Sequence, residues 1–389
     1  MPNPLRELEK HGQSVWYDNL NRALLASGDL QRMVDEDGVS GGTSNPSIFE
    51  KAMNSVAYYD DDIRRLTREN KDVYQVFDAL TIADIGRCAD VFRPIYEETA
   101  GRDGFASLEV SPTLAHDTPA SISEAHRLFQ ALRRPNALIK IPGTPEGLPA
   151  IEQCLREGIN INITLLFGVE NYERVAWAYV RALEARRAAN QPIDRIASVA
   201  SFFVSRVDTL TDEKLEEKLK SAGSDAGLAQ ELRSLLGQAG IANAKIAYAK
   251  FREIFSGARW QALAEHGAGV QRCLWASTST KNPGYRDVMY VEGLIGPDTV
   301  NTLPQATLDA FRDHGIVEST LGKDVAGAFD TVRRLERAGI GFQAVTDELQ
   351  VQGVQLFADS YQKSIQGLKQ KHDALRAEME SGIGAARGD

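Results

Sequence analysis

Two short runs carry most of the architectural information in this chain: Ala137-Leu138-Ile139-Lys140-Ile141-Pro142 and Asn160-Ile161-Asn162-Ile163-Thr164-Leu165-Leu166-Phe167. Both read as β-strands, whose side chains alternate between two faces. Lys140 stands between two isoleucines, and Asn160, Asn162 and Thr164 share one face of the second run. A helix-like segment separates the runs, which predicts parallel strands covered on both faces, where polar side chains are unexpected. Buried polar groups need partners, so we expect these side chains to be held by each other, by water or by a ligand.

The same alternation of strand and helix signals continues along the chain. Strand-like runs occur near residues 14–18, 38–45, 106–112, 137–142, 160–167, 196–204, 271–277 and 298–303. Leu148, Ile151, Leu155 and Ile159 form one apolar helical stripe, and a second stripe lies within residues 171–189. Eight such units predict an α/β fold, a (β/α)8 TIM barrel. The alternative is an open doubly wound sheet, which is weakened by the lack of Gly-x-Gly-x-x-Gly after the first strand.

The chain has 389 residues, of which 43% are hydrophobic and 25% charged, an ordinary globular composition. We expect a single barrel domain spanning residues 1–389. Three segments exceed a minimal barrel: a mostly helical region at 46–105, a charge-rich helical insertion at about 208–268, and a final long helix at 345–378. By default we expect the insertion and the last helix only to cover the barrel.

Composition excludes several kinds of partner. The net charge is −10 and no basic run is long, so a nucleic-acid partner is not expected. No apolar run approaches the roughly 20 residues of a membrane span. Three scattered cysteines and an amino terminus without an apolar leader predict a cytoplasmic protein. A small phosphorylated substrate stays compatible with the acidic charge.

Polar side chains stand at the ends of the expected strands, and in a barrel enzyme the carboxyl ends of the strands carry the active site. The candidate set comprises Asp18, Thr43, Asn45, Glu109, Lys140, Asn162, Thr164, Ser201, Phe203, Arg206 and Ser277. It contains one amine and two carboxylates but no histidine. Nowhere do His, Cys and Asp take metal-ligand spacing, so we expect neither a metal nor another cofactor, and no Ser-His-Asp nucleophile.

A buried lysine beside carboxylates suits one chemistry well. Desolvation lowers the pKa of a lysine and frees the neutral amine as a nucleophile. The amine can form a Schiff base with a carbonyl, and the iminium then accepts electrons from an adjacent C–C bond. Such a reaction also needs carboxylates that move protons, and Asp18 and Glu109 are the candidates.

Five stretches of the chain resemble the transaldolase family and occur in the same order as in that family. They are Thr-Ser-Asn-Pro-Ser-Ile-Phe at 43–49, Ser-Leu-Glu-Val at 107–110, Leu-Ile-Lys-Ile-Pro at 138–142, Gly-Ile-Asn-Ile-Asn-Ile-Thr-Leu-Leu-Phe at 158–167 and Ser-Phe-Phe-Val-Ser-Arg at 201–206. The resemblance spans roughly residues 15 to 350, and the length is similar to that of the longer bacterial subgroup.

The resemblance implies a class I aldolase-type barrel without a cofactor, with the Schiff base on Lys140. It implies transfer of a dihydroxyacetone unit from sedoheptulose 7-phosphate or fructose 6-phosphate to an aldose phosphate, glyceraldehyde 3-phosphate or erythrose 4-phosphate, as in the pentose phosphate pathway. Asp18 would be the base at the hydroxyl whose C–C bond breaks. Glu109 would move protons through a water held by Thr164.

The same resemblance assigns binding roles. Asn45 and Asn162 would bind donor hydroxyls, Ser201 the far end of the dihydroxyacetone unit, and Arg206 the phosphate. Phe203 is either simple core or an apolar wall that leaves no hydroxyl to organise hydrolytic water.

One departure from the family concerns the phosphate. Shorter members read Ala-Ser-Phe-Arg after the seventh strand, and that arginine grips phosphate. Here residues 275–283 read Trp-Ala-Ser-Thr-Ser-Thr-Lys-Asn-Pro, so Ser277 keeps its place and the arginine is absent. Lys281, with Thr278 or Ser279, is the candidate replacement, although a lysine is a point charge rather than a fork.

Other interpretations remain open from the sequence. Asp18 could cap a helix, Glu109 could belong to a structural ion pair, Arg206 could pair with Asp208, and Lys281 could be a solvated loop residue. At the level of the whole protein, the rivals are a fructose 6-phosphate aldolase that releases free dihydroxyacetone and a catalytically silent sugar-phosphate-binding barrel.

Overall fold

The computed structural model describes residues 3–45, 47–49, 57–223 and 225–385. Its centre is a closed parallel barrel in which each strand pairs with the next and β8 pairs with β1. The strands are β1 (Gln13–Tyr17), β2 (Val39–Gly42), β3 (Ala106–Glu109), β4 (Ala137–Pro142), β5 (Ile161–Leu166), β6 (Ser198–Phe203), β7 (Arg272–Ala276) and β8 (Thr299–Leu303). The predicted barrel is confirmed, and closure of the sheet rules out the open doubly wound alternative.

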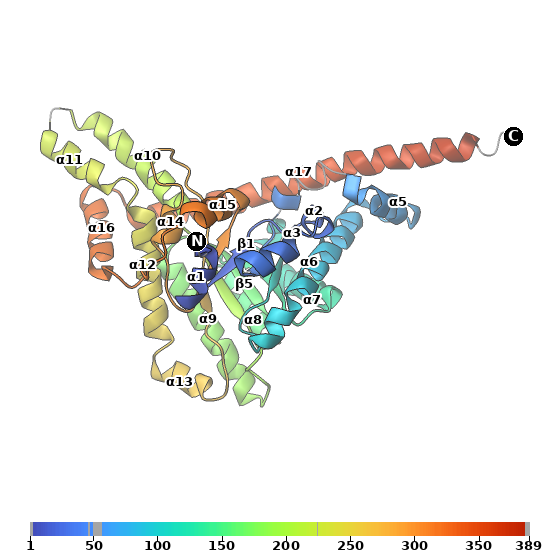
Figure 1. Cartoon of the computed structure of the whole chain (residues 1–389), viewed down its shortest axis with the longest axis horizontal. Helices are drawn as coiled ribbons and strands as arrows, with labels where there is room; N and C mark the ends of the chain where they lie inside the picture. Colours follow the sequence, from blue (N-terminus) through green and yellow to red (C-terminus); the bar gives the residue numbers. More distant parts are fainter. Residues whose placement is uncertain (1–2, 46, 50–56, 224, 386–389) are drawn as a thin grey trace.

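Helices surround the barrel on all sides (Figure 1). Before β4 they are α1 (Pro4–Lys10), α2 (Arg22–Ala26), α3 (Asp29–Arg32), the π-helix η1 (Met33–Asp37), η2 (Ala57–Tyr59), α5 (Asp60–Arg68), α6 (Val73–Glu98), η3 (Pro112–Leu114) and α7 (Thr118–Leu132). From β4 onward they are α8 (Gly147–Arg156), α9 (Val169–Ala188), α10 (Ser205–Ser221), α11 (Ala226–Leu235), α12 (Ala239–Ile254), α13 (Ala258–Ala264), α14 (Met289–Glu292), α15 (Gln305–His314), α16 (Val325–Arg337) and α17 (Phe342–Ala385).

Two apolar clusters show which way each strand face points. Ile139 and Ile141 of β4 belong to the outer cluster together with Ile151 and Leu155 of α8, so this face packs against the helices. Leu138 belongs to a different cluster, formed inside the barrel with residues of the opposite strands. Side chains alternate along a strand. Lys140 therefore shares the inward face of Leu138, as the alternating pattern predicts.

The amino-terminal end of the barrel is closed by a buried polar network around Asp103. Its carboxylate accepts hydrogen bonds from Trp16 Nε1 at 2.8 Å and from Ser40 Oγ at 2.9 Å, and a third from Ser14. Arg272 of β7 lies 3.4 Å from the same carboxylate, and both side chains are buried. Four strand-borne groups thus converge on one acceptor and fix the strands relative to one another.

The barrel wall needs a glycine where the Trp16 indole lies against it. A Cβ on Gly41 would be 2.7 Å from Trp16 Nε1 and 2.9 Å from the carbonyl oxygen of Phe105. No larger residue fits at position 41 without a shift, which explains this glycine near the end of β2.

The segment between β6 and β7 is helical throughout, in α10 to α13. Among these, α12 packs against α9 and β7 and takes the place of the helix that follows the sixth strand of a barrel. Helices α10 and α11 pack against each other and extend away from the barrel (Figure 1). The predicted region 208–268 therefore includes one helix of the barrel itself.

The last helix, α17, is 44 residues long and crosses the molecule from α10 to α5 (Figure 1). It passes over the carboxyl ends of the strands, where Gln350 Nε2 donates to the carbonyl of Gly143 at 2.9 Å. Gly353 sits against Leu165 and Phe167 at the end of β5. The chain thus covers one side of the barrel mouth with its own carboxyl-terminal part.

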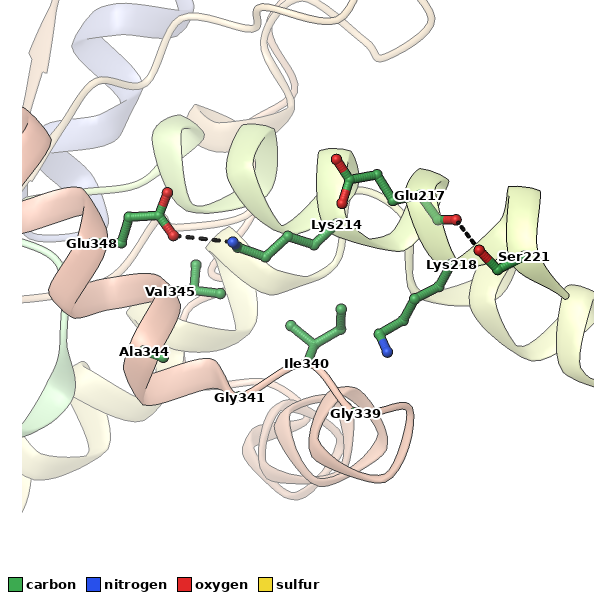
Figure 2. Close-up of a pocket in the computed structure, with 10 residues that line it drawn as sticks. All are labelled: Lys214, Glu217, Lys218, Ser221, Gly339, Ile340, Gly341, Ala344, Val345 and Glu348. Atoms are coloured by element: carbon green, nitrogen blue, oxygen red, sulfur yellow. Dashed lines mark hydrogen bonds and ion pairs between the residues drawn. The ribbon is translucent and has the colours of Figure 1, made fainter.

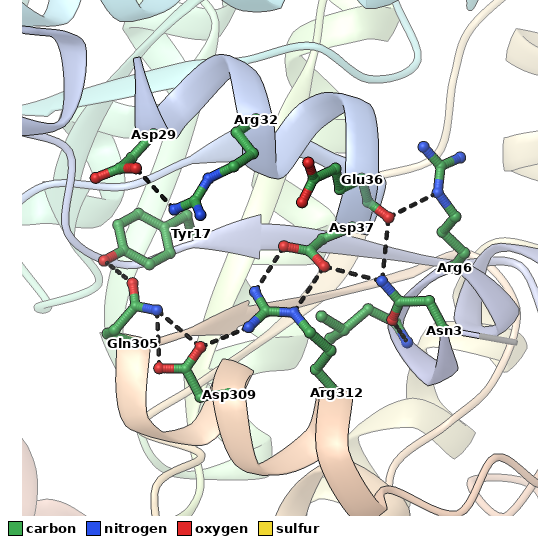
Figure 3. A network of polar contacts seen from close by, with 11 residues as sticks. Asn3, Arg6, Tyr17, Asp29, Arg32, Glu36, Asp37, Gln305, Asp309 and Arg312 are labelled. Atoms are coloured by element: carbon green, nitrogen blue, oxygen red, sulfur yellow. Dashed lines mark hydrogen bonds and ion pairs between the residues drawn. The ribbon is translucent and has the colours of Figure 1, made fainter. Parts of the chain in front are cut away.

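The start of the chain is tied to the helix that follows β8 by a polar network (Figure 3). Arg312 of α15 donates to both carboxylate oxygens of Asp37, at 2.8 and 2.6 Å, and Asn3 Nδ2 donates to the same carboxylate at 2.8 Å. A bidentate arginine pair has a fixed geometry. It joins η1, α15 and the residue that caps α1. Within the described residues, no helix is long and apolar enough to cross a membrane.

The Asp103 network yields a test of stability. We expect Asp103→Ala to lower the free energy of unfolding by about 3–5 kcal/mol, because Arg272 would keep a buried, unpaired charge. Urea denaturation monitored by circular dichroism measures the change. The control is Asp330→Ala, which removes an exposed pair with Arg333 and should change stability by about 0–1 kcal/mol. A loss below about 1 kcal/mol for Asp103→Ala would contradict the assigned role of the network.

Candidate active site

The inward polar face at the carboxyl ends of β3, β4 and β5 brings the principal predicted residues together. Glu109, the last residue of β3, is the register partner of Lys140 in β4. Lys140 in turn is the register partner of Asn162 in β5. Neighbouring strands are about 4.8 Å apart, so the hydrogen-bonded sheet itself sets the spacing of these side chains.

Lys140 is enclosed, with 6% of its side chain exposed. Its Nζ lies 3.3 Å from Glu109 Oε2 and donates to the carbonyl oxygen of Ser44 at 3.1 Å. The Phe357 ring of α17 has its centroid 5.8 Å from the same nitrogen, near enough for a cation–π contact. A buried ammonium thus has one carboxylate, one carbonyl and one aromatic face around it.

Glu109 is the most tightly enclosed of the predicted acids, with 4% of its side chain exposed. Burial raises the pKa of Glu109. The positive charge of Lys140 opposes this rise, and the negative charge of Asp18 adds to it. Apart from the ion pair with Lys140, neither carboxylate oxygen finds a hydrogen-bond partner among the described residues. Burial therefore favours the protonated form of this carboxyl group more than exposure to water would.

Asp18 directly follows β1 and lies at the mouth of the barrel. Its Oδ1 accepts a hydrogen bond from Thr43 Oγ1 at 2.6 Å. Burial raises the pKa of Asp18, against the opposing charge of Lys140, the Thr43 hydrogen bond and the charge of Lys281. The next helix is capped by Asn21, whose Oδ1 accepts from the backbone N–H of Leu24, so Asp18 is not its cap.

A chain of hydrogen bonds lines the floor beside the lysine. Asn162 Nδ2 donates to Ser107 Oγ at 3.0 Å, and Ser201 Oγ donates to Asn162 Oδ1 at 2.6 Å. The amide of Asn162, on β5, is therefore oriented by one residue of β3 and one residue of β6. The hydroxyl of Thr164, also buried, has no hydrogen-bond partner among the described residues.

Asn45 takes part in a turn, as its position before a proline suggests. Its Oδ1 accepts from the backbone N–H of Ile48 at 3.2 Å, which leaves its amide NH2 as the group that can serve a ligand. Residue 46 lies outside the described residues. Asn45 and Glu109 also line a small cavity of about 40 Å³ beneath α17.

Phe203, at the end of β6, packs against two other aromatic rings. Its ring lies 5.1 Å from that of Phe167 and 6.5 Å from that of Phe357, measured between centroids. It therefore belongs to the inner apolar cluster. No hydroxyl is present on any of these three rings.

Two cations lie near the mouth. Arg206 is the second residue of α10, and burial lowers the pKa of its guanidinium. The loop after β7 carries Lys281, which is exposed. Partial desolvation and the Arg206 charge lower the pKa of this lysine, and the charge of Asp18 opposes the shift. Lys281 Nζ donates to Ser279 Oγ at 2.6 Å, and Ser277 pairs with Ser205 at 2.9 Å between hydroxyl oxygens. Asp208 binds the backbone of Gly240 at 2.7 Å and forms no ion pair with Arg206 among the described contacts.

Some neighbours of the site did not appear among the predicted site residues. Ser107 and the carbonyl of Ser44 lie within the recognisable motifs, so their strand positions could have indicated them. Phe357 stands on a long helix with ordinary periodicity, and only the fold brings it to Lys140. Groups of three or more potential metal ligands are absent from the described part of the chain.

A second hollow, of about 450 Å³, lies between α10 and the turn that leads into α17 (Figure 2). Lys214 Nζ and Glu348 Oε2 bridge it at 3.0 Å, and Ile340 and Val345 line its side. None of the predicted site residues lines this hollow. Its contacts dock the start of α17 on α10.

Comparison with known proteins agrees with this geometry. Residues 15–368 match the family described as Transaldolase/Fructose-6-phosphate aldolase. Transaldolase 2 of Nostoc punctiforme is 49% identical over 375 residues, which cover 96% of this chain and 98% of that protein. The transaldolases of Trichodesmium erythraeum and Thiobacillus denitrificans are 47% and 46% identical, over 95% and 92% of this chain and 97% and 98% of their own lengths. By this extent of similarity, the chain belongs to the transaldolase/fructose-6-phosphate aldolase family.

Proposed function

We propose that this protein is a transaldolase that works through a Schiff base on Lys140. The observation that supports this most directly is the enclosed Lys140–Glu109 pair at 3.3 Å, placed inside a barrel mouth that also holds Asp18. The donor would be sedoheptulose 7-phosphate or fructose 6-phosphate, and the acceptor glyceraldehyde 3-phosphate or erythrose 4-phosphate. The unit transferred is dihydroxyacetone.

The first half-reaction forms the covalent intermediate. Transfer of one proton from Lys140 to Glu109 leaves a neutral amine, which attacks the ketose carbonyl carbon. Glu109 then returns a proton to the departing hydroxyl through a water bound by Thr164, and water leaves as the iminium forms. The raised pKa of Glu109 suits this alternation between acid and base.

The second half-reaction breaks and remakes a C–C bond. Asp18 takes the proton of the hydroxyl next to the scissile bond, the bond electrons move into the iminium, and the aldose phosphate departs. The resulting enamine attacks the carbonyl of an acceptor, and Asp18 returns its proton to the new hydroxyl. Hydrolysis of the iminium then releases the new ketose phosphate and restores Lys140.

The remaining predicted residues are assigned to binding. Asn45 and Asn162 would bind donor hydroxyls, with Asn162 preoriented by its hydrogen bonds to Ser107 and Ser201. Ser201 would contact the end of the dihydroxyacetone unit. Phe203 would keep water away from the enamine, which favours transfer to an aldehyde over release of free dihydroxyacetone.

The phosphate would bind near Arg206 and Lys281, with Ser277 holding the start of the loop. Support comes from the mutual proximity of the two cations, of which Arg206 has no carboxylate partner among the described contacts and Lys281 interacts only electrostatically with Asp18. We further propose that residues 1–389 form one domain, with α10 and α11 as its helical extension. A cytoplasmic location is consistent with Cys88, Cys154 and Cys273, which are all buried and free.

Borohydride trapping tests the covalent step. With fructose 6-phosphate present, reduction should leave a three-carbon adduct on Lys140, identified by peptide mass mapping. Lys140→Met should abolish the adduct, whereas Lys245→Met, which removes an amine remote from the mouth, should retain it. A folded protein that yields no adduct would exclude the Schiff-base mechanism. Accumulation of free dihydroxyacetone without an acceptor would instead support the aldolase alternative.

Asp18 should determine the acid side of the pH–rate profile. It acts as a base when ionised, and its pKa is raised in the folded protein. We therefore expect kcat/KM to fall with decreasing pH through a value above the ordinary carboxyl pKa of about 4. Asp18→Asn should lower kcat about 10²- to 10⁴-fold and remove this limb. An unchanged acid limb in the variant would contradict the assignment.

Ionised Asp18 should lower the free energy of unfolding at neutral pH. A carboxyl whose pKa is raised by folding binds its proton more tightly in the folded state, so its ionised form destabilises the fold once the pH exceeds both pKa values. Asp18→Asn should therefore increase the free energy of unfolding at pH 8, with a gain that shrinks as the pH falls toward 4. Urea titrations at several pH values measure this. A loss of stability at pH 8 would refute it.

A further inference from the structure

The loop that carries Lys281 is held close to a second positive charge. The Arg206 guanidinium lowers the pKa of Lys281, which places the two cations within electrostatic reach. Within the described part of the chain, Arg206 has neither a hydrogen bond nor an ion pair, and Lys281 contacts Ser279. The two like charges repel each other, whereas the Asp18 carboxylate attracts Lys281. Hydrogen bonds elsewhere in the loop also hold it in place.

Those contacts attach the loop to α10 at two points. At its start, the backbone N–H of Ser205 donates to the carbonyl of Ser277 at 3.0 Å, and the two hydroxyls pair at 2.9 Å. Farther along, Tyr285 OH donates to Asp212 Oδ2 at 2.7 Å. Lys281 lies midway between these points. Both anchors are on the helix that carries Arg206, so α10 sets the position of both cations.

The second anchor is itself rigidly supported. Asp212 Oδ1 accepts from the backbone N–H of Gly237 at 2.9 Å, and Asp212 is buried. The Tyr285 ring lies directly against Gly237, where an added Cβ would be 2.8 Å from Tyr285 Cζ and where φ is +68°. One turn earlier, Asp208 Oδ1 accepts from the N–H of Gly240 at 2.7 Å. These contacts fix α10 to the start of α12 and give the Tyr285 hydroxyl an immobile acceptor.

We propose that Tyr285 and Asp212 are positioning residues that hold Lys281 beside Arg206 and so determine affinity for the phosphate end of the sugar. This inference rests on the proposed function. Neither residue would touch the reacting carbons. Their loss should weaken recognition of phosphate while the chemistry at Lys140 continues.

The test compares two acceptors that differ only in the phosphate. With saturating fructose 6-phosphate, Tyr285→Phe should raise KM for erythrose 4-phosphate about fivefold, the effect of losing roughly one hydrogen bond. Its kcat should stay within about twofold, and the kinetic constants for erythrose should not change. Asp212→Ala should act in the same direction. Asp212→Asn should restore most of the affinity, because its amide oxygen can accept from the backbone N–H of Gly237 while its NH2 donates to the Tyr285 hydroxyl oxygen.

The matched control is Tyr248→Phe, which removes a tyrosine hydroxyl bound to the carbonyl of Pro297 at 3.0 Å, before the start of β8. All constants should be retained in this variant. An unchanged KM for erythrose 4-phosphate in Tyr285→Phe, or equal losses with both acceptors, would overturn the inference. Should the wild-type protein lack transfer activity, the proposed function itself fails. Calorimetric binding of inorganic phosphate then decides the inference alone, because equal affinity in wild type and Tyr285→Phe would refute it.

Discussion

The enclosed charge pair of Lys140 and Glu109 is the constraint on which the rest of the structure depends. Removing two ions from water costs several kcal/mol for each, and the cost is offset only when their geometry is well defined. Here the geometry comes from the backbone, since the two residues are register partners on neighbouring strands. The pairing of β3 with β4 must therefore be in register before the pair can form, and the surrounding barrel encloses it. The Asp103 network at the opposite end of that barrel joins β1, β2 and β7.

Most of the fold could be predicted because buried strands can be recognised from their apolar composition and from the alternation of their side chains. The strand expected at 38–45 ends at Gly42, and the one expected at 106–112 ends at Glu109. The residues expected in these strands but lying beyond them leave the sheet and form the mouth of the barrel. There the polar side chains serve the candidate site and not the pairing of the strands. Closure could not be derived from periodicity, because it depends on pairing between β1 and β8 at opposite ends of the chain. For a similar reason the sequence did not reveal that α12 is the barrel helix that follows β6. This follows from the packing of α12 on α9 and not from its sequence pattern.

The candidate site also contains some residues that could be predicted from the sequence and some that could not. Lys140 and Asn162 could be placed on the inward face from alternation alone, and the family resemblance supplied the roles proposed for them. The carbonyl of Ser44 could not be foreseen as a partner of the lysine, because every residue has a carbonyl and no sequence pattern marks this one. Phe357 was missed because its helix shows only ordinary amphipathic spacing. The Tyr285–Asp212 contact joins two separate segments through a loop without regular structure, for which sequence offers no period to follow.

The path of α17 has a consequence for the order in which the molecule assembles. This helix packs on α5, α6, β5 and α10, which come from widely separated parts of the chain, so its docking surface does not exist until those parts have met. Contacts between distant segments form late, because the loops between them must close first. The aromatic face beside Lys140 comes with this helix. The enclosure of the lysine is therefore complete only once α17 has docked, and the barrel strands alone do not supply it.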